Sequence, residues 1–373
     1  MKLIIFLSLL QILSGNPAAF LRDSGQLKTL QTLTPVGDSS VFTLDYKADY
    51  HLQDFLDASL NSQAAVKAFA AAKLLNVPSP APKGESFNPA CSAFQAVTPE
   101  GDVIYGRNFD YRFEDGGTIM MRTRPRGGYK SLSMVSMGFL GMNSAQYTDG
   151  RTDLSMLLAA PLMQMDGMNE KGLAVSVLVV MYDDCAKQLD STKKDIMTSV
   201  MMRMFLDRAA TVDEALEMLR GYNFWSDGYQ TGRKKGNFSN YHFLLSDAGG
   251  KTVVLECVQQ DGPGSGSPWI ISTVDEKMAT NHFRTPAWRN VGRQDERFSH
   301  MEEALAQKGG VLTEQEAMRL LDEVHQEASD GHEGRTQWSV VYNLTKGTAK
   351  LCLNHQYDKM YEFSLRGFGR KKK

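Results

Sequence analysis

A hairpin expected from the sequence brings a thiol close to two charged side chains, a guanidinium and a carboxylate. Residues 91–108 contain two short apolar runs around a Pro-Glu-Gly-Asp turn. Antiparallel pairing across this turn sets Cys91 opposite about Asp110 and returns Arg107 to the same strand end. A neighbouring guanidinium lowers the pKa of a thiol and raises its share of thiolate, the nucleophilic form. Cys91 is therefore a candidate nucleophile, although a cysteine beside an arginine in an exported protein is more often structural.

The position of Cys91 in the chain adds a second argument. The preceding residues, 76–90, hold four of the chain's 12 prolines, which neither a helix nor a central strand accepts. An exposed linker of this kind is open to cleavage. Cleavage before Cys91 would give it a free α-amine with a pKa of about 8, which can act as general base for its own thiol. No separate catalytic histidine would then be needed.

The elements that must position these residues alternate between strands and pairs of helices. Apolar spacing predicts two short helices between residues 52 and 75. Helix pairs are also expected at 196–207 with 211 onward, and at 296–306 with 313 onward, where Thr211 with Glu214 and Thr313 with Glu316 read as capping boxes. Strands are expected at 132–136, 154–158, 173–180, 241–245, 252–258, 269–273, 337–344, 349–353 and 360–365. This order favours an α+β fold with two antiparallel sheets covered by helical layers.

Composition and charge exclude several classes of protein. The chain has 373 residues, a net charge of −2, 42% hydrophobic and 23% charged residues. These are the values of an ordinary globular protein, and they exclude global disorder, collagen and a coiled coil. The balanced charge gives no indication of a nucleic-acid partner.

The N-terminus predicts export. Lys2 precedes an apolar run that ends near small residues, which is typical of a secretory signal peptide over residues 1–19. The run is shorter than the roughly 20 residues that span a bilayer, and no later stretch of that length lacks charge. We therefore expect a secreted or otherwise extracytoplasmic protein with three parts: the signal peptide, an N-terminal propeptide-like segment over 20–90, and a catalytic domain over 91–373.

Five short motifs then occur in an order that resembles a known family. They are residues 91–94 (Cys-Ser-Ala-Phe), 106–110 (Gly-Arg-Asn-Phe-Asp), 168–175 (Met-Asn-Glu-Lys-Gly-Leu-Ala-Val), 280–283 (Thr-Asn-His-Phe) and 338–342 (Trp-Ser-Val-Val-Tyr). The chain resembles the choloylglycine hydrolase and penicillin acyltransferase group of N-terminal-nucleophile hydrolases, the linear amide C–N hydrolases, from Cys91 to about residue 365. Each motif alone is weak, and the ordered set of five is specific.

The resemblance implies a four-layer αββα sandwich and a mature enzyme that begins at Cys91. It implies that Cys91 is the nucleophile and its amine the base, that Asp110 binds this amine, and that Arg107 lies against the thiol. It also implies that Asn281 donates to the oxyanion, a role that needs preorganised donors. Arg297 falls where the family carries a further active-site arginine.

Two features depart from bile-salt hydrolases within this family. Val179 stands where those enzymes have an asparagine, so the oxyanion contact expected there is the main-chain N–H of Val179, and specificity for conjugated bile salts is in doubt. The long segment before Cys91 is also unlike them and is similar to that of secreted or propeptide-bearing relatives.

Several alternatives stay open at this level. An enzyme of the same fold could transfer the acyl group to an amine instead of water. Two further hypotheses are a papain-like cysteine protease and a non-catalytic exported ligand-binding module. Methionine clusters at 120–121, 163–168 and 201–204 suit an apolar acyl group, although core packing explains most of them equally well. The seven histidines form no His-Glu-x-x-His pair, so neither a metal nor another cofactor is predicted. Relatives are often dimers or tetramers, which leaves a homo-oligomer open.

Overall fold

The computed structural model describes residues 23–37, 40–75, 91–112, 117–142, 154–226, 238–328 and 334–366. The predicted signal peptide and the proline-rich residues 76–90 lie outside these ranges. No helix in the described ranges is long and apolar enough to cross a bilayer.

Two large sheets form the centre of the molecule. The first has nine strands in the order β1-β2-β5-β6-β7-β8-β11-β12-β13, and the second has six in the order β14-β3-β4-β17-β18-β19. The strands of the first sheet are β1 (Thr34–Pro35), β2 (Val41–Asp45), β5 (Thr118–Thr123), β6 (Ser131–Ser136), β7 (Gln164–Asn169), β8 (Ala174–Tyr182), β11 (Phe238–Ser246), β12 (Thr252–Gln259) and β13 (Trp269–Val274). Those of the second are β14 (Met278–Ala279), β3 (Cys91–Val97), β4 (Val103–Tyr111), β17 (Arg335–Asn343), β18 (Thr348–Leu353) and β19 (Tyr361–Ser364).

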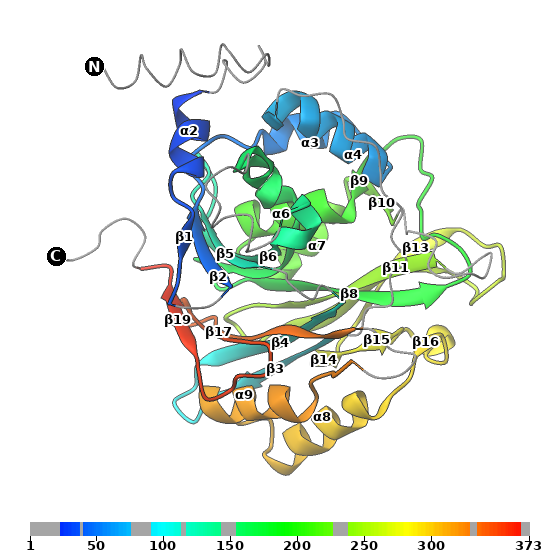
Figure 1. Ribbon diagram of the computed structural model, residues 1–373. Helices are drawn as coiled ribbons and strands as arrows, with labels where there is room; N and C mark the ends of the chain where they lie inside the picture. Colours follow the sequence, from blue (N-terminus) through cyan, green and yellow to red (C-terminus); the bar gives the residue numbers. More distant parts are fainter. Residues whose placement is uncertain are drawn as a thin grey trace.

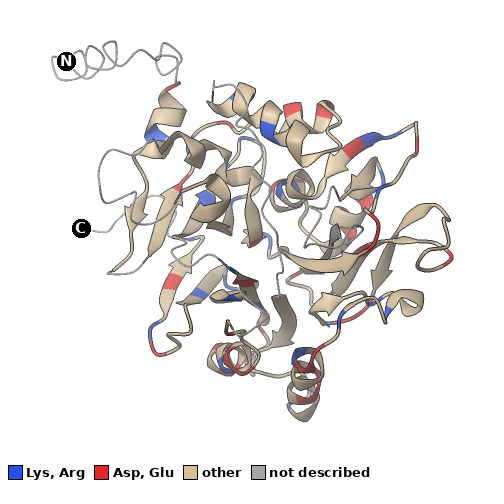
Figure 2. Ribbon diagram, turned by 45° about the vertical axis from the view of Figure 1, so that its right-hand side comes forward, with Lys and Arg blue, Asp and Glu red and all other residues tan. Residues whose placement is uncertain are grey.

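Helices cover the outer face of each sheet (Figure 1). On the side of the nine-stranded sheet lie α6 (Thr198–Arg208) and α7 (Val212–Leu219), with α2 (Ser24–Leu30) at the edge of the sheet. Further out on the same side lie α3 (Leu52–Asp57), which packs against α6, and α4 (Gln63–Ala70). On the six-stranded sheet lie α8 (Glu296–Gln307) and α9 (Glu314–Glu323). The predicted α+β fold, an αββα sandwich, is therefore confirmed. Charged residues of both signs are interspersed along the helices and loops (Figure 2), in keeping with the balanced net charge.

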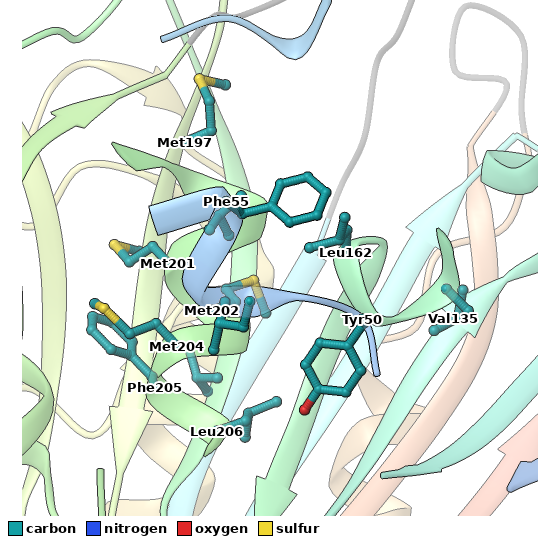
Figure 3. Close-up of a cluster of buried hydrophobic side chains, with 14 of the residues drawn as sticks. Tyr50, Phe55, Val135, Leu162, Met197, Met201, Met202, Met204, Phe205 and Leu206 are labelled. Carbon is teal, nitrogen blue, oxygen red and sulfur yellow. The ribbon is translucent and has the colours of Figure 1, made fainter. Parts of the chain in front are cut away.

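Three apolar clusters hold these four layers together. The first packs between the nine-stranded sheet and its helices, and includes Met201, Met202 and Met204 of α6. The second lies between the two sheets, and the third between the six-stranded sheet and α8 and α9. The methionines of α6 point into the first cluster beside Phe205 (Figure 3), so they are packing residues of the core.

The segment before Cys91 is an integral part of this core. Strand β2 pairs in parallel with β5, whereas all other described pairs within the two large sheets are antiparallel. Phe42 and Leu44 of β2 and Phe55 of α3 belong to the first cluster. Figure 3 shows Tyr50 and Phe55 lying against α6. The described residues between 24 and 75 therefore complete the nine-stranded sheet and the helical layer on its outer face.

Two local predictions need correction. Residues 154–158, expected as a strand, begin a 3-10 helix, Leu154–Leu162. Short apolar runs buried on all sides do not distinguish strand from helix by their periodicity, and here every residue from 157 to 162 is buried. At α7, Thr211 accepts from the N–H of Glu214, but the Glu214 carboxylate accepts from Ala210 instead of closing the capping box. At α9 the box of Thr313 and Glu316 is complete.

Candidate active site

The hairpin of β3 and β4 places Cys91 at the end of a central strand. Cys91 pairs with Phe109, one residue from the expected partner Asp110. The shift arises because the loop has five residues, 98–102, closed by a hydrogen bond from the Thr98 N–H to the Asp102 carbonyl of 2.8 Å. Because side chains alternate along a strand, Cys91 and Arg107 share the face between the sheets, and Asp110 faces the helices.

The thiol is enclosed next to the Arg107 guanidinium. Cys91 is 2% exposed and Arg107 is fully buried. Burial raises the pKa of the Cys91 thiol, because the thiolate loses its hydration; the positive charge of Arg107 and a hydrogen bond from the Asp110 N–H act in the opposite direction. The expected neighbourhood of thiol and guanidinium is therefore present.

Arg107 is oriented by contacts from both sheets. Its Nη1 donates to the Asn108 carbonyl at 2.9 Å and its Nη2 to the Val177 carbonyl at 2.6 Å. Its Nε lies 3.7 Å from Oδ2 of Asp166 on β7, across the sandwich. Asp166 in turn accepts from Trp338 Nε1 at 3.0 Å and from the Tyr342 hydroxyl at 2.6 Å. These contacts fix the guanidinium in a water-excluded position.

The main chain of Cys91 is held by Asn281 and Arg297. Its N–H donates to Asn281 Oδ1 at 2.6 Å, and its carbonyl accepts from Arg297 Nη1 at 3.0 Å. Arg297, the second residue of α8, also donates to Asn281 Oδ1 at 2.8 Å and to Asp110 Oδ2 at 3.2 Å. Arg297 thus connects Cys91, Asp110 and Asn281. Its orientation comes from Asp295, the N-cap of α8, whose carboxylate accepts from its Nε at 3.0 Å.

Asp110 lies on the helix side of the six-stranded sheet. Its Oδ1 accepts from the Thr336 hydroxyl of β17 at 2.6 Å. Burial raises the pKa of this carboxyl to about 7, although the positive charge of Arg297 acts against the shift. In this uncleaved chain the Cys91 nitrogen contacts Asn281, and the contact expected between Asp110 and a free amine stays a prediction.

Asn281 and Val179 are in direct contact. Asn281 lies in the short strand β15 (Asn281–His282), which pairs with β16 (Gly292–Arg293). Its Nδ2 donates to the Val179 carbonyl on β8 at 2.8 Å. Donation to an oxyanion, the role predicted for Asn281 and for the Val179 N–H, would require the Asn281 amide to exchange this carbonyl for the substrate oxygen.

A buried pair, His242 and Glu256, supports the segment that carries Asn281. His242 Nε2 lies 2.7 Å from the Thr280 carbonyl, and its Nδ1 lies 3.1 Å from Glu256 Oε1. The Glu256 carboxylate also accepts from the N–H groups of Arg284 and Thr285, at 2.6 and 2.8 Å. The chain on both sides of Asn281 is therefore fixed to β11 and β12.

Sequence reasoning did not find Asp166, Thr336, Asp295 or the pair of His242 and Glu256. Asp166 and Thr336 come from strands far from Cys91 in the chain, so only the tertiary fold brings them together. Asp295 carried one usable signal, because an aspartate directly before a helical pattern is a common N-cap. Cys91, Cys257 and Cys352 are buried and form no disulfide, and the two arginines beside Cys91 disfavour a metal cation there.

Comparison with known proteins shows what part of this chain is similar to. Residues 91–262 match the model of the linear amide C-N hydrolases, choloylglycine hydrolase family. Penicillin V acylase of Pectobacterium atrosepticum is 26% identical over 181 residues, which are 47% of this chain and 46% of that protein. The chain thus matches about half the length of this curated relative.

Solved structures show the same fold. A crystal structure of a mutant conjugated bile acid hydrolase from Clostridium perfringens superposes with a TM-score of 0.50 and 14% identity, covering 75% of this chain and 93% of that one. A second variant of that enzyme gives a TM-score of 0.51 and 15% identity, with 75% and 94% covered. The chain is therefore related, over residues 91–262, to the linear amide C–N hydrolases of the choloylglycine hydrolase family.

Proposed function

We propose that this protein is a secreted cysteine amidase that hydrolyses the C–N bond of a linear, non-peptide amide, with Cys91 as its nucleophile after cleavage of the peptide bond before it. The proposal rests on one observation, that Cys91 makes two contacts at once, one through its thiol and one through its main-chain nitrogen. The thiol of Cys91 lies beside the buried guanidinium of Arg107, and its main-chain nitrogen donates to Asn281 Oδ1 at 2.6 Å. A freed α-amine would keep a polar partner there.

The reaction follows from these positions. The neutral amine takes the thiol proton, and the thiolate attacks the amide carbon. The Asn281 amide and the Val179 N–H donate to the resulting oxyanion, and the leaving amine takes the proton from the Cys91 ammonium as the C–N bond breaks. Water, deprotonated by the same amine, then cleaves the thioester and releases the acid. Each proton removed in one half-reaction is returned within that half-reaction.

The uncleaved chain is expected to be inactive. Its thiol is 2% exposed, and burial raises the pKa of that thiol. The Cys91 nitrogen, as part of a peptide bond, cannot accept a proton. Cleavage creates the base and lets the end of β3 adjust, so the proposal joins activation and processing in one event.

The experiment is intact-mass measurement with N-terminal sequencing of the exported protein, followed by an amide-hydrolysis panel. The panel contains penicillin V, a glycine-conjugated bile salt, an N-acyl amino acid and an N-acyl ethanolamine. Wild type and the control Cys185→Ala should yield a chain beginning at Cys91 and release acid from at least one substrate, whereas Cys91→Ala should release none. An active wild type that still carries residues 24–90 joined to Cys91 would contradict the proposal.

A further inference from the structure

A separate group of side chains lies where the end of α9 meets the turn after β18. His325 and Glu327 follow α9, and His355 lies in the turn between β18 and β19. One potential ligand atom from each lies within 4.8 Å of the others. We propose that His325, Glu327 and His355 bind a divalent transition-metal ion, with Zn²⁺ as the best match.

The spacing of the donor atoms suits such an ion. Glu327 Oε1 lies 3.5 Å from His325 Nε2 and 3.7 Å from His355 Nδ1. Ligands about 2.0–2.2 Å from a tetrahedral Zn²⁺ are separated from one another by roughly 3.4 Å. Small side-chain movements therefore bring the three atoms onto one ion, and two imidazoles with one carboxylate are ligands that zinc prefers. Water completes the coordination, because Glu327 approaches from the solvent side with 75% of its side chain exposed.

The surroundings orient both imidazoles. Nδ1 of His325 contacts the Asp322 carbonyl and lies 3.3 Å from the Asp322 carboxylate. Donation of the Nδ1 proton to Asp322 leaves the lone pair on Nε2, which faces Glu327; metal-ligating histidines typically have such a partner. Asn354 and His355 both have positive φ, 47° and 60°, a conformation that non-glycine residues rarely adopt. This unusual turn holds His355 toward α9.

The site connects to the catalytic network through one residue. Gln326 lies between two of the ligands; its N–H donates to Thr336 Oγ1 at 2.9 Å, and its carbonyl accepts from the Thr336 N–H at 2.8 Å. Thr336 donates to Asp110 at 2.6 Å. A bound ion would fix the backbone on both sides of Gln326 and so stabilise the position of Thr336. The three ligands are positioning residues for Asp110 and take no part in the reaction.

Zinc binding to the chain tests the inference directly and independently of the proposed enzyme activity. Untagged protein is freed of metal with EDTA, its accessible thiols are alkylated, and ZnCl₂ is titrated by calorimetry. Wild type should bind one equivalent, and His355→Ala and Glu327→Gln should each weaken this binding at least about tenfold. The matched control is His300→Gln, because His300 forms an exposed pair with Glu323 at 2.8 Å on the same helical layer and should leave the binding unchanged.

Thermal unfolding provides the second measurement. Zn²⁺ should raise the unfolding temperature of wild type and of His300→Gln by more than that of Glu327→Gln, whose exposed side chain leaves folding intact. Wild type that binds no zinc under these conditions, or His355→Ala and Glu327→Gln that bind it as wild type does, would overturn the inference. Wild type that binds zinc but hydrolyses no amide of the panel would instead count against the proposed function alone.

Discussion

Two fully buried arginine–aspartate pairs lie on opposite sides of the nine-stranded sheet, and they differ in how tightly they close. Arg203 and Asp207 belong to one helix, α6, with Nη2 and Oδ1 2.7 Å apart. Arg107 and Asp166 come from different sheets, with Nε and Oδ2 3.7 Å apart. Both guanidinium groups are completely shielded from water.

The remaining partners explain what each pair does. Asp207 accepts from the Tyr50 hydroxyl at 2.6 Å, and Arg203 donates to Ser131 at 2.8 Å, so this group links α6 to the N-terminal segment and to β6. Asp166 is instead occupied by Trp338 and Tyr342, and the Nη atoms of Arg107 bind carbonyl groups. The charge of Arg107 is therefore neutralised only in part and can act on the Cys91 thiol. A close pair stabilises the fold, and a loose pair leaves its charge available for chemistry.

The largest expected effect is the loss of turnover in Arg107→Gln. Without the guanidinium, the Cys91 thiolate loses its nearest positive charge, and kcat should fall by about 10²-fold or more, as for the loss of one preorganised charge-stabilising group. Arg203→Gln, measured on the folded fraction, should stay within about threefold of wild type because its pair does not reach the thiol. Equal losses of kcat in Arg107→Gln and Arg203→Gln would show that the charge of Arg107 has no special role at the thiol.

The stability of the closed pair is tested by Arg203→Gln in urea unfolding. Leaving Asp207 buried without its cation should lower the free energy of unfolding by about 3 kcal/mol. The double variant Arg203→Met with Asp207→Leu should recover most of this loss, because no unpaired charge then remains in the core. A double variant as unstable as the single one would show that the pair itself, and not the orphaned carboxylate, determines stability.

On the Cys91 side of the comparison, the buried Asp110 carboxyl should make stability depend on pH. Its pKa is raised to about 7 in the folded chain from 3.8, so between these pH values the native state binds a proton that the unfolded state has lost. Stability should therefore fall as pH rises from about 4 to about 7 and then level off. The pKa of about 7 already includes the opposing effects of Arg297 and Thr336, so the fall should be of the same order as the Arg203→Gln effect.

Urea unfolding of Cys91→Ala, with its uncleaved state checked by intact mass, measures this pH dependence. The same protein with Asp110→Asn added is the control, because asparagine does not titrate. If the difference in free energy of unfolding between the two stays flat from pH 4 to 7, the raised pKa of Asp110 is wrong.

The smallest expected effect is the difference in stability between variants of two tyrosines in the N-terminal segment, Tyr50 and Tyr46. Tyr50 donates to the Asp207 carboxylate, and Tyr46 donates to the neutral carbonyl of Leu158 at 2.7 Å. Hydrogen bonds to charged groups contribute more, so Tyr50→Phe should cost about 2 kcal/mol and Tyr46→Phe about 1 kcal/mol in urea unfolding. The reverse order would mean that the Asp207 pair closes fully without help from Tyr50.

The sequence predicted the parts of the site that depend on local structure. The turn at residues 99–102 was sufficient to join Cys91 to Arg107 and Asp110, although its five-residue loop moved the register by one. Arg297 and Asn281 were found through the family resemblance and do meet at Cys91. Asp166 and Thr336 gave no local signal, because their roles exist only after distant strands have packed. The β2 pairing was missed for the same reason, since nothing in a short apolar run specifies a parallel neighbour.

The parallel pairing of β2 with β5 has a consequence for any chain that starts at Cys91. In the intact protein the edge of the nine-stranded sheet is β1, only two residues long and containing Pro35, which cannot donate to an incoming strand. Without residues 24–75, β5 would become the edge, with the apolar Ile119, Met120 and Met121 beside unpaired backbone groups. Such an edge promotes intermolecular β-sheet growth, so the N-terminal segment also protects the enzyme from self-association.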